Sequence, residues 1–262
     1  MNSEIIELDL LRLLWALGLM AIAIGLAAWQ RLGLVGTLAL ATVRTVLQLV
    51  AVGFFLSIVF ALRSPLLVLA VLMVMLTIAA LTARNRIDKT LPNLLPWLWG
   101  SLFISTALTL AHVTVAVIRP EQWYEPRYLI PLAGIVFGTA MNAAAITGDR
   151  LVSTLRQSRT EIETHLSLGA TPEQAIARYR QEAIKAGLIP TINSMMVVGL
   201  VKLPGIITGQ MLSGIDPLSA ALYQMLIMFM LAFASLVTVL LIAYGIKRQF
   251  FNQAAQLVNP TQ

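Results

Sequence analysis

The chain has 262 residues, of which 58% are hydrophobic and 11% are charged, and its mean hydropathy is +0.84. A soluble domain of this size needs more polar surface to cover its core, so the composition excludes a soluble protein and indicates an integral membrane protein. The net charge of +6 could suggest nucleic acid binding, but membrane topology explains the basic residues better and no nucleic acid partner is expected. Cysteine is absent, which excludes disulfides and thiolate metal sites.

Apolar runs predict about seven membrane-spanning helices, because each span needs ~20 mostly apolar residues. In chain order the runs are 13–29, 34–62, 65–83, 97–118, 129–147, 188–214 and 220–246. The second run is longer than a bilayer requires, so it is expected to tilt or to begin as an interfacial turn. The expected fold is an all-α polytopic protein of the inner (plasma) membrane, with a single domain over residues 1–262.

Lysine and arginine residues are distributed unevenly between the two sides of these spans. One side holds the basic residues of the polar stretch 148–187 together with Arg31, Arg84, Arg86, Lys89, Lys247 and Arg248. The other side holds Arg12, Arg63, Arg119 and Arg127. Because cytoplasmic loops carry an excess of basic residues, we expect the N-terminus outside, the C-terminus inside and the polar stretch in the cytoplasm.

The polar stretch 148–187 predicts two helices joined by a sharp turn. Helical spacing places Leu151, Leu155, Ile162 and Leu166 on one face, so the fifth span is expected to extend into the cytoplasm. Gly169 suits the left-handed position that ends a helix.

A second helix is expected to begin after Gly169 and to run to Gly187. Thr171 fits the N-cap, Pro172 the first helical position, and Gln174 completes a capping box. Two capped helices would form a rigid elbow, although composition alone also fits a solvated cytoplasmic hairpin.

Proline and glycine interrupt the sixth apolar run, at Pro190, Gly199, Pro204, Gly205 and Gly209. Proline removes a helical hydrogen bond, and carbonyls freed at membrane depth need protein or a water-filled cavity around them. The segment from Lys202 to Gly205 therefore predicts a kink or break that lines a cavity. A packing kink without any ligand contact is the alternative.

Polar residues within the spans are candidates for a substrate path. Arg44 and Gln48 are four residues apart and share a helix face; a structural ion pair would also explain the arginine. The other candidates are Asn142, Asn193, Ser194, Met196, Lys202, Pro204 and Gly205. No cluster of histidine and carboxylate side chains within a span indicates a metal site, so any metal ligands are unknown.

Motifs for catalysis and nucleotide binding are missing from the sequence. There is no G-x-x-x-x-G-K-[ST] motif, so we expect no ATP site and no cofactor on this chain. No H-E-x-x-H motif and no paired carboxylates within a span occur, so no catalytic residues are predicted.

The segment from Glu163 to Pro172 resembles the EAA-x-x-x-G loop of ATP-binding-cassette (ABC) permeases. The segments VRTVLQL (43–49), IPLAGIVFGTAMNA (130–143), SLGATPEQA (167–175) and the GLVKLPG…SGIDP string within 189–224 resemble the FetB family of permeases. That family includes bacterial iron-export permeases and plant aluminium-sensitivity permeases, and the resemblance covers essentially the whole chain.

The resemblance implies a permease subunit that forms a homodimer, pairs with a separate cytosolic ATPase carrying ATP and Mg, and moves a metal such as iron, or a metal-related solute, outward. It implies that the elbow contacts the ATPase through Glu163, Leu168, Gly169, Ala170, Thr171 and Pro172. A secondary transporter or channel without an ATPase, and a membrane scaffold or sensor that binds a cytosolic partner, are the alternatives.

This sequence departs from the family within the sixth run. Asn193 and Met196 stand where members commonly carry Asp and Lys, and Lys202 stands where a small residue is common. A site for a hard cation prefers carboxylate oxygens, so these departures speak against transport of bare iron.

Overall fold

The computed structural model describes residues 10–62 and 64–258. Helices account for nearly all of this part of the chain, apart from loops and two isolated β-bridges, which confirms the predicted all-α fold. The described residues group into two compact units, 10–62 and 64 with 212–214, and 65–211 with 215–258. The single domain over residues 1–262 stays a prediction.

The first unit is a pair of long apolar helices, α1 (Leu10–Trp29) and α2 (Val35–Leu62), which pack against each other. Arg31 and Gly33 have positive φ in the turn that reverses the chain between them. Most large apolar side chains of these two helices are exposed, because no other described part of the chain covers them. Such exposure suits helices that face lipid or other membrane helices.

The second unit holds the remaining helices. They are α3 (Pro65–Ile87), α4 (Leu94–His112), which continues as the π-helical turn η1 (Val113–Ile118), α5 (Pro126–Gln157), α6 (Arg159–Ser167), α7 (Pro172–Ala175), α8 (Ala177–Val197), α9 (Gly205–Leu212) and α10 (Pro217–Phe250).

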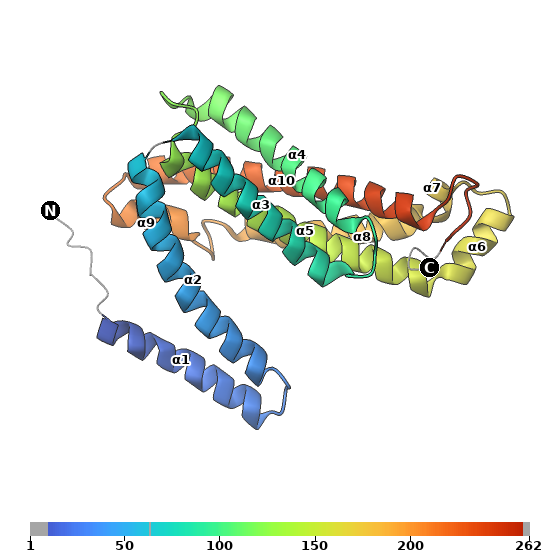
Figure 1. Ribbon diagram of the computed structural model, residues 1–262, viewed down its shortest axis with the longest axis horizontal. Coiled ribbons are helices and arrows are strands. Elements are labelled where there is room, and N and C mark those ends of the chain that lie inside the picture. Colours follow the sequence, from blue (N-terminus) through green and yellow to red (C-terminus); the bar gives the residue numbers. More distant parts are fainter. Residues whose placement is uncertain (1–9, 63, 259–262) are drawn as a thin grey trace. The chain divides into compact units, whose positions relative to one another are not determined.

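The centre of the second unit is the contact between α5 and α10 (Figure 1). Helices α3 and α8 also pack on α5, while α4 and α8 pack on α10. The buried hydroxyl of Thr238 on α10 donates to that of Ser105 on α4 over 2.7 Å. Gly245 lets α10 approach the Trp97 ring closely, because a Cβ there would lie 2.6 Å from that ring.

Six described helices are long and apolar enough to cross a membrane: α1, α2, α3, α4 with η1, α5 and α10. The predicted sixth span is formed by α8 and α9, which a non-helical segment at 198–204 separates. About six to seven long apolar helices are therefore present, and the interruption of the sixth run is confirmed, whereas a membrane crossing by α8 and α9 stays a prediction.

Two ion pairs place the basic loops at one end of the second unit. Arg156 Nη2 lies 2.6 Å from Asp88 Oδ2, and Lys247 pairs with Glu173. The loop after α3, the polar stretch and the end of α10 therefore lie on the same side, as the charge distribution predicted. The orientation of that side toward the cytoplasm stays a prediction.

The polar stretch contains two helix breaks that the periodicity did not predict. The expected extension of α5 to Leu166 is wrong, because α5 ends at Gln157 and α6 begins after Ser158. Serine favours helix ends over interiors, and the break still leaves Ile162 fully buried. The expected helix to Gly187 is also wrong, since Ile176 separates α7 from α8, and α8 continues through Gly187 to Val197.

The Asp88 carboxylate joins the loop after α3 to α5. The N–H and hydroxyl of Thr90 donate to its Oδ1 over 2.7 and 2.6 Å, and Arg156 pairs with its Oδ2. Burial alone would raise the pKa of Asp88, but the hydrogen bonds from Thr90 and the pairing with Arg156 outweigh burial and hold that pKa below its usual 3.8.

Asp88→Asn should therefore lower the free energy of unfolding at pH 7 by about 1–2 kcal/mol. Because the pKa is lowered in the folded state, the stabilisation is complete above pH 3.8 and is lost as the pH falls through the folded-state pKa. Melting temperatures of both proteins in detergent, from pH 7 to pH 3, would check this, with the neighbouring Lys89→Gln as control. A difference in melting temperature between wild type and Asp88→Asn that already narrows well above pH 4 would contradict this prediction.

Candidate functional site

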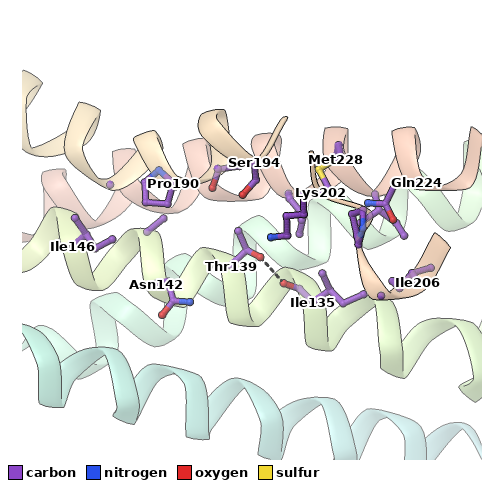
Figure 2. A pocket seen from close by; sticks show the side chains of 17 residues that line it. Ile135, Thr139, Asn142, Ile146, Pro190, Ser194, Lys202, Ile206, Gln224 and Met228 are labelled. Carbon is purple, nitrogen blue, oxygen red and sulfur yellow. Dashed lines mark hydrogen bonds between the residues drawn. The ribbon is translucent and has the colours of Figure 1, made fainter. Parts of the chain in front are cut away.

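A cavity of about 480 Å³ lies in the second unit, where the broken helix faces α5 and α10 (Figure 2). Its lining residues are Ile135, Thr139, Asn142, Ala143 and Ile146 of α5, Gly187, Pro190, Thr191 and Ser194 of α8, Lys202 and Pro204 of the break, Gly205 and Ile206 of α9, and Gln224, Ile227, Met228 and Leu231 of α10. On each long helix these residues recur every three or four positions, so one face of each helix forms one wall.

The break between α8 and α9 is a compact loop whose backbone groups bond locally. The N–H groups of Leu200, Val201 and Lys202 lie within 3.0–3.3 Å of the Val197 carbonyl, and the N–H of Gly199 donates to the Lys202 carbonyl over 3.0 Å. Gly199 has a φ of 82°, which suits glycine. The predicted break and the cavity beside it are therefore both present, and the loop pairs part of its backbone locally.

Six polar side chains line the cavity: Thr139, Asn142, Thr191, Ser194, Lys202 and Gln224. Arg86 of α3 donates to Oδ1 of Asn142 over 2.7 Å, and the Thr139 hydroxyl donates to the Ile135 carbonyl over 3.0 Å. Gln224 is 4% exposed, and its Oε1 has no hydrogen-bond partner among the described residues. The wall can therefore offer hydrogen bonds and one positive charge to a solute.

The structure gathers only part of the predicted substrate path. Asn142, Ser194, Lys202, Pro204 and Gly205 line the cavity together. Asn193 and Met196 are exposed on other faces of α8, because the cavity face carries residues 187, 190, 191 and 194. Arg44 and Gln48 are exposed on α2, in the first unit. A role for these four residues in transport stays a prediction.

Thr139, Thr191 and Gln224 are polar cavity residues that the sequence analysis missed. Thr139 lies three positions before Asn142, so helical spacing from Asn142 could have found it. Gln224 carried no such signal, because no other polar residue of α10 lies on its cavity face.

The close approach of α5 and α8 beside the cavity depends on Gly187. A Cβ at this position would lie 2.0 Å from the Thr147 hydroxyl and 2.7 Å from the Ala143 carbonyl oxygen. The sequence analysis treated Gly187 only as a helix end. Other glycines near the cavity are less crowded, because nothing lies within 4 Å of a Cβ at Gly138, Gly205 or Gly209.

A second cavity of about 200 Å³ adjoins the first and shares Pro204, Gln224 and Met228 with it. Met195 and Met225 also line it. The described residues contain no group of three or more His, Cys, Asp or Glu side chains that could hold a metal.

The predicted elbow consists of α6, the turn 168–171 and α7, and we use this name for residues 159–175. Gly169 has a φ of 92°, and the Ala170 N–H donates to the His165 carbonyl over 3.0 Å, which confirms the left-handed helix end. The Thr171 hydroxyl accepts from the Gln174 N–H, and the Gln174 side chain accepts from the Thr171 N–H, which confirms the capping box.

The elbow has a buried inner side and an exposed tip. Ile162 and Ala175 of the elbow are buried, whereas Leu168 at its tip is 80% exposed. The exposed leucine lies on a capped turn in a polar stretch outside the predicted spans, so it is accessible to another protein. The contact roles of Glu163, Leu168, Gly169, Ala170, Thr171 and Pro172 stay predictions.

An ion pair that sequence reasoning missed joins the elbow to the end of α10. Lys247 donates to Glu173, and this hydrogen bond lowers the pKa of the Glu173 carboxyl. The Lys247 ammonium lies 5.0 Å from the Tyr244 ring, which packs edge-on against Trp97 at 5.8 Å. The elbow is therefore connected to α8 through the chain and to α10 through this pair.

Comparison with known proteins places the chain among membrane proteins. Residues 10–251 match the family described as "Uncharacterised protein family (UPF0014)". A UPF0014 membrane protein of Synechocystis is 53% identical, over 98% of this chain and all of the relative. The "Probable iron export permease protein FetB" of Escherichia coli is 33% identical, over 98% and 97% of the two chains.

The plant protein "Protein ALUMINUM SENSITIVE 3" of Arabidopsis thaliana is 31% identical, over 92% of this chain and 87% of the relative. No solved structure matches the chain. The match over nearly all of its length, together with the helices described above, shows that the chain is a multi-pass membrane protein of the UPF0014 family.

Proposed function

We propose that this protein is the membrane-spanning permease subunit of an ABC exporter, working as a homodimer with a separate cytosolic ATPase that binds ATP and Mg. The observation that carries the proposal is the elbow, a capped turn with an exposed leucine that is joined to both α8 and α10. The relation to a protein named as an iron export permease supports a transport role and, as cargo, iron or another metal-related solute.

In the proposed mechanism, closure of the ATPase on ATP displaces the elbow. One route for that displacement runs along α8, which ends at the loop carrying Lys202 on the cavity wall. The other runs through Glu173 and Lys247 to α10, which forms the opposite wall. Because both walls meet the same cavity, a movement of the elbow changes the width of the cavity and opens it to one side of the membrane.

Leu168→Asp should weaken binding of the ATPase at least about tenfold, because it places a charge where an apolar side chain is expected to enter the partner. Co-purification with a nucleotide-binding protein encoded near the gene, followed by a titration of the two purified subunits, would measure this. Ala254→Asp adds the same charge at an exposed position of the C-terminal segment and should leave binding unchanged. Equal binding by both variants would remove the elbow as the contact.

Reconstituted vesicles separate the proposal from its two rivals. An ABC exporter should release iron or another metal only when both the ATPase and ATP are present. A secondary transporter or channel should release it without the ATPase, and a scaffold or sensor should release nothing in either case.

A further inference from the structure

The wall of the 480 Å³ cavity carries the positive charge of Lys202 and has no acidic side chain among its lining residues. We infer that the cavity binds its solute through an anionic group, a carboxylate or a phosphate, so that a metal cargo enters as an anionic complex with such ligands and not as a bare cation. The role of that solute as cargo rests on the proposed function, whereas the binding preference can be tested without it.

Lys202 supplies a positive charge to the cavity. Its side chain extends from the loop toward the face of α5 that carries Thr139 (Figure 2). Within the described part of the chain the Lys202 ammonium has no ion-pair partner, and no acidic side chain lines the cavity. A lysine in a membrane interior usually pairs with an acidic group or serves a transported solute, and here no acidic group is at hand.

Asn142 adds a hydrogen-bond donor, and the hydrogen bond from Arg86 fixes the orientation of its amide group. A guanidinium has only donors, so the Asn142 atom 2.7 Å from Arg86 Nη1 has to be the oxygen. The amide NH₂ of Asn142 is then left to face other partners. Arg86 itself places a second positive charge next to this wall.

The start of α9 contributes to the same preference. The first N–H groups of a helix have no acceptor within it and carry partial positive charge. Helix α9 begins at Gly205, and both Gly205 and Ile206 line the cavity. The hydroxyl of Ser194 can also donate, whereas the unpaired Oε1 of Gln224 on the facing wall is an acceptor.

The size and surroundings of the cavity fit a small organic anion or chelate. Pockets for metabolite-sized ligands measure about 300–1,000 Å³, and this cavity lies within that range. A neighbouring cleft at the same end of α5 carries Asp149 and Glu182, but Arg150 and Lys185 balance them. The charged residues that line this cleft therefore balance, whereas those that line the cavity do not.

The natural absence of cysteine allows a direct measurement of this charge. Ser194→Cys would put a single thiol on the cavity wall of the full chain, in nanodiscs of neutral phosphatidylcholine. The thiol is modified by sulfonatoethyl methanethiosulfonate, which is negative, or by trimethylammonium-ethyl methanethiosulfonate, which is positive. The ratio of the two rates cancels differences in thiol ionisation and accessibility.

Asn193→Cys is the matched control, because residue 193 is exposed on another face of the same helix. For each variant we divide the modification rate with the negative reagent by the rate with the positive reagent. We expect this ratio to be about tenfold higher for Ser194→Cys than for the control. Lys202→Met should bring the two ratios together, and Lys202→Arg should keep them apart. Equal ratios for Ser194→Cys and Asn193→Cys with Lys202 in place would overturn the inference. So would a ratio for Ser194→Cys that Lys202→Met leaves unchanged.

Protection of the Ser194→Cys thiol identifies the occupant. Citrate or pyrophosphate should slow modification by an uncharged maleimide, MgCl₂ and MnCl₂ should not, and Lys202→Met should abolish the protection. Protection by the divalent cations alone would overturn the inference. Protection by phosphatidylglycerol in the nanodisc, without any by citrate or pyrophosphate, would assign the site to a lipid headgroup and overturn the assignment to a solute.

None of these readouts depends on ATP or a partner. A chain that shows the charge preference but no ATP-dependent export would retain the anion site and lose the proposed function. An ATP-dependent exporter without the preference would keep the function and lose the anion site.

Discussion

Replacing Gly187 with valine is expected to lower the free energy of unfolding by about 3 kcal/mol, because over-packing at a helix contact forces the backbones apart. Even a Cβ at this position would meet the Ala143 carbonyl oxygen at 2.7 Å and the Thr147 hydroxyl at 2.0 Å. The carbonyl belongs to the backbone of α5 and cannot turn away. The melting temperature and the yield of monodisperse protein in detergent would both fall.

Gly138→Val is the matched control, since Gly138 lies on α5 near the same cavity and has nothing within 4 Å of a Cβ. It should cost about 1 kcal/mol or less. A second test uses Gly187→Ala, which Thr147→Ala should rescue in part by removing the hydroxyl but not the carbonyl contact. Equal melting temperatures for Gly187→Val and Gly138→Val would show that α5 and α8 do not depend on this contact.

Gly169→Val is expected to reduce ATP-coupled transport at least about tenfold while leaving membrane insertion intact. Gly169 has a φ of 92°, where a β-branched residue costs about 1–3 kcal/mol of backbone strain. Nothing lies within 4 Å of a Cβ at Gly169, so the strain would change the shape of the turn and not the packing beneath it. The ratio of solute released to ATP hydrolysed, in vesicles with the ATPase, would measure the uncoupling.

Gly169→Asn separates backbone shape from side-chain size at this turn. Asparagine tolerates the left-handed conformation far better than valine, so this variant should keep most of the coupled transport. If asparagine and valine reduced transport equally, the conformation of the turn would not be the property that matters. Unchanged transport in Gly169→Val would remove the elbow from the coupling mechanism.

Features that depend only on a few neighbouring residues could be predicted from the sequence. The capping box of Thr171 and Gln174 and the positive φ of Gly169 follow from the side chains at those positions alone. The break at 198–204 likewise follows from Gly199 and Pro204, because neither residue continues a helix readily. Each of these features was predicted correctly from a few neighbouring residues.

Features that depend on distant partners could not be predicted in this way. Glu173 and Lys247 are 74 residues apart, and nothing in either segment shows that they pair. Gly187 was interpreted as a helix end because its partner, Ala143, lies on another helix. The face of α8 that lines the cavity depends on how α8 packs against α5 and α10, which is why Asn193 and Met196 were selected in place of Thr191.

The two neighbouring cavities have a consequence for the speed of passage. Pro204, Gln224 and Met228 line both, so these three residues lie between a space of about 480 Å³ and one of about 200 Å³. Methionine is unbranched and changes rotamer readily. A solute that passes between these spaces needs side-chain rotation, which is fast, whereas the proline ring can yield only if the whole loop moves. The slow step of passage would then belong to the loop, and mutations of Pro204 would alter the turnover rate more than mutations of Met228.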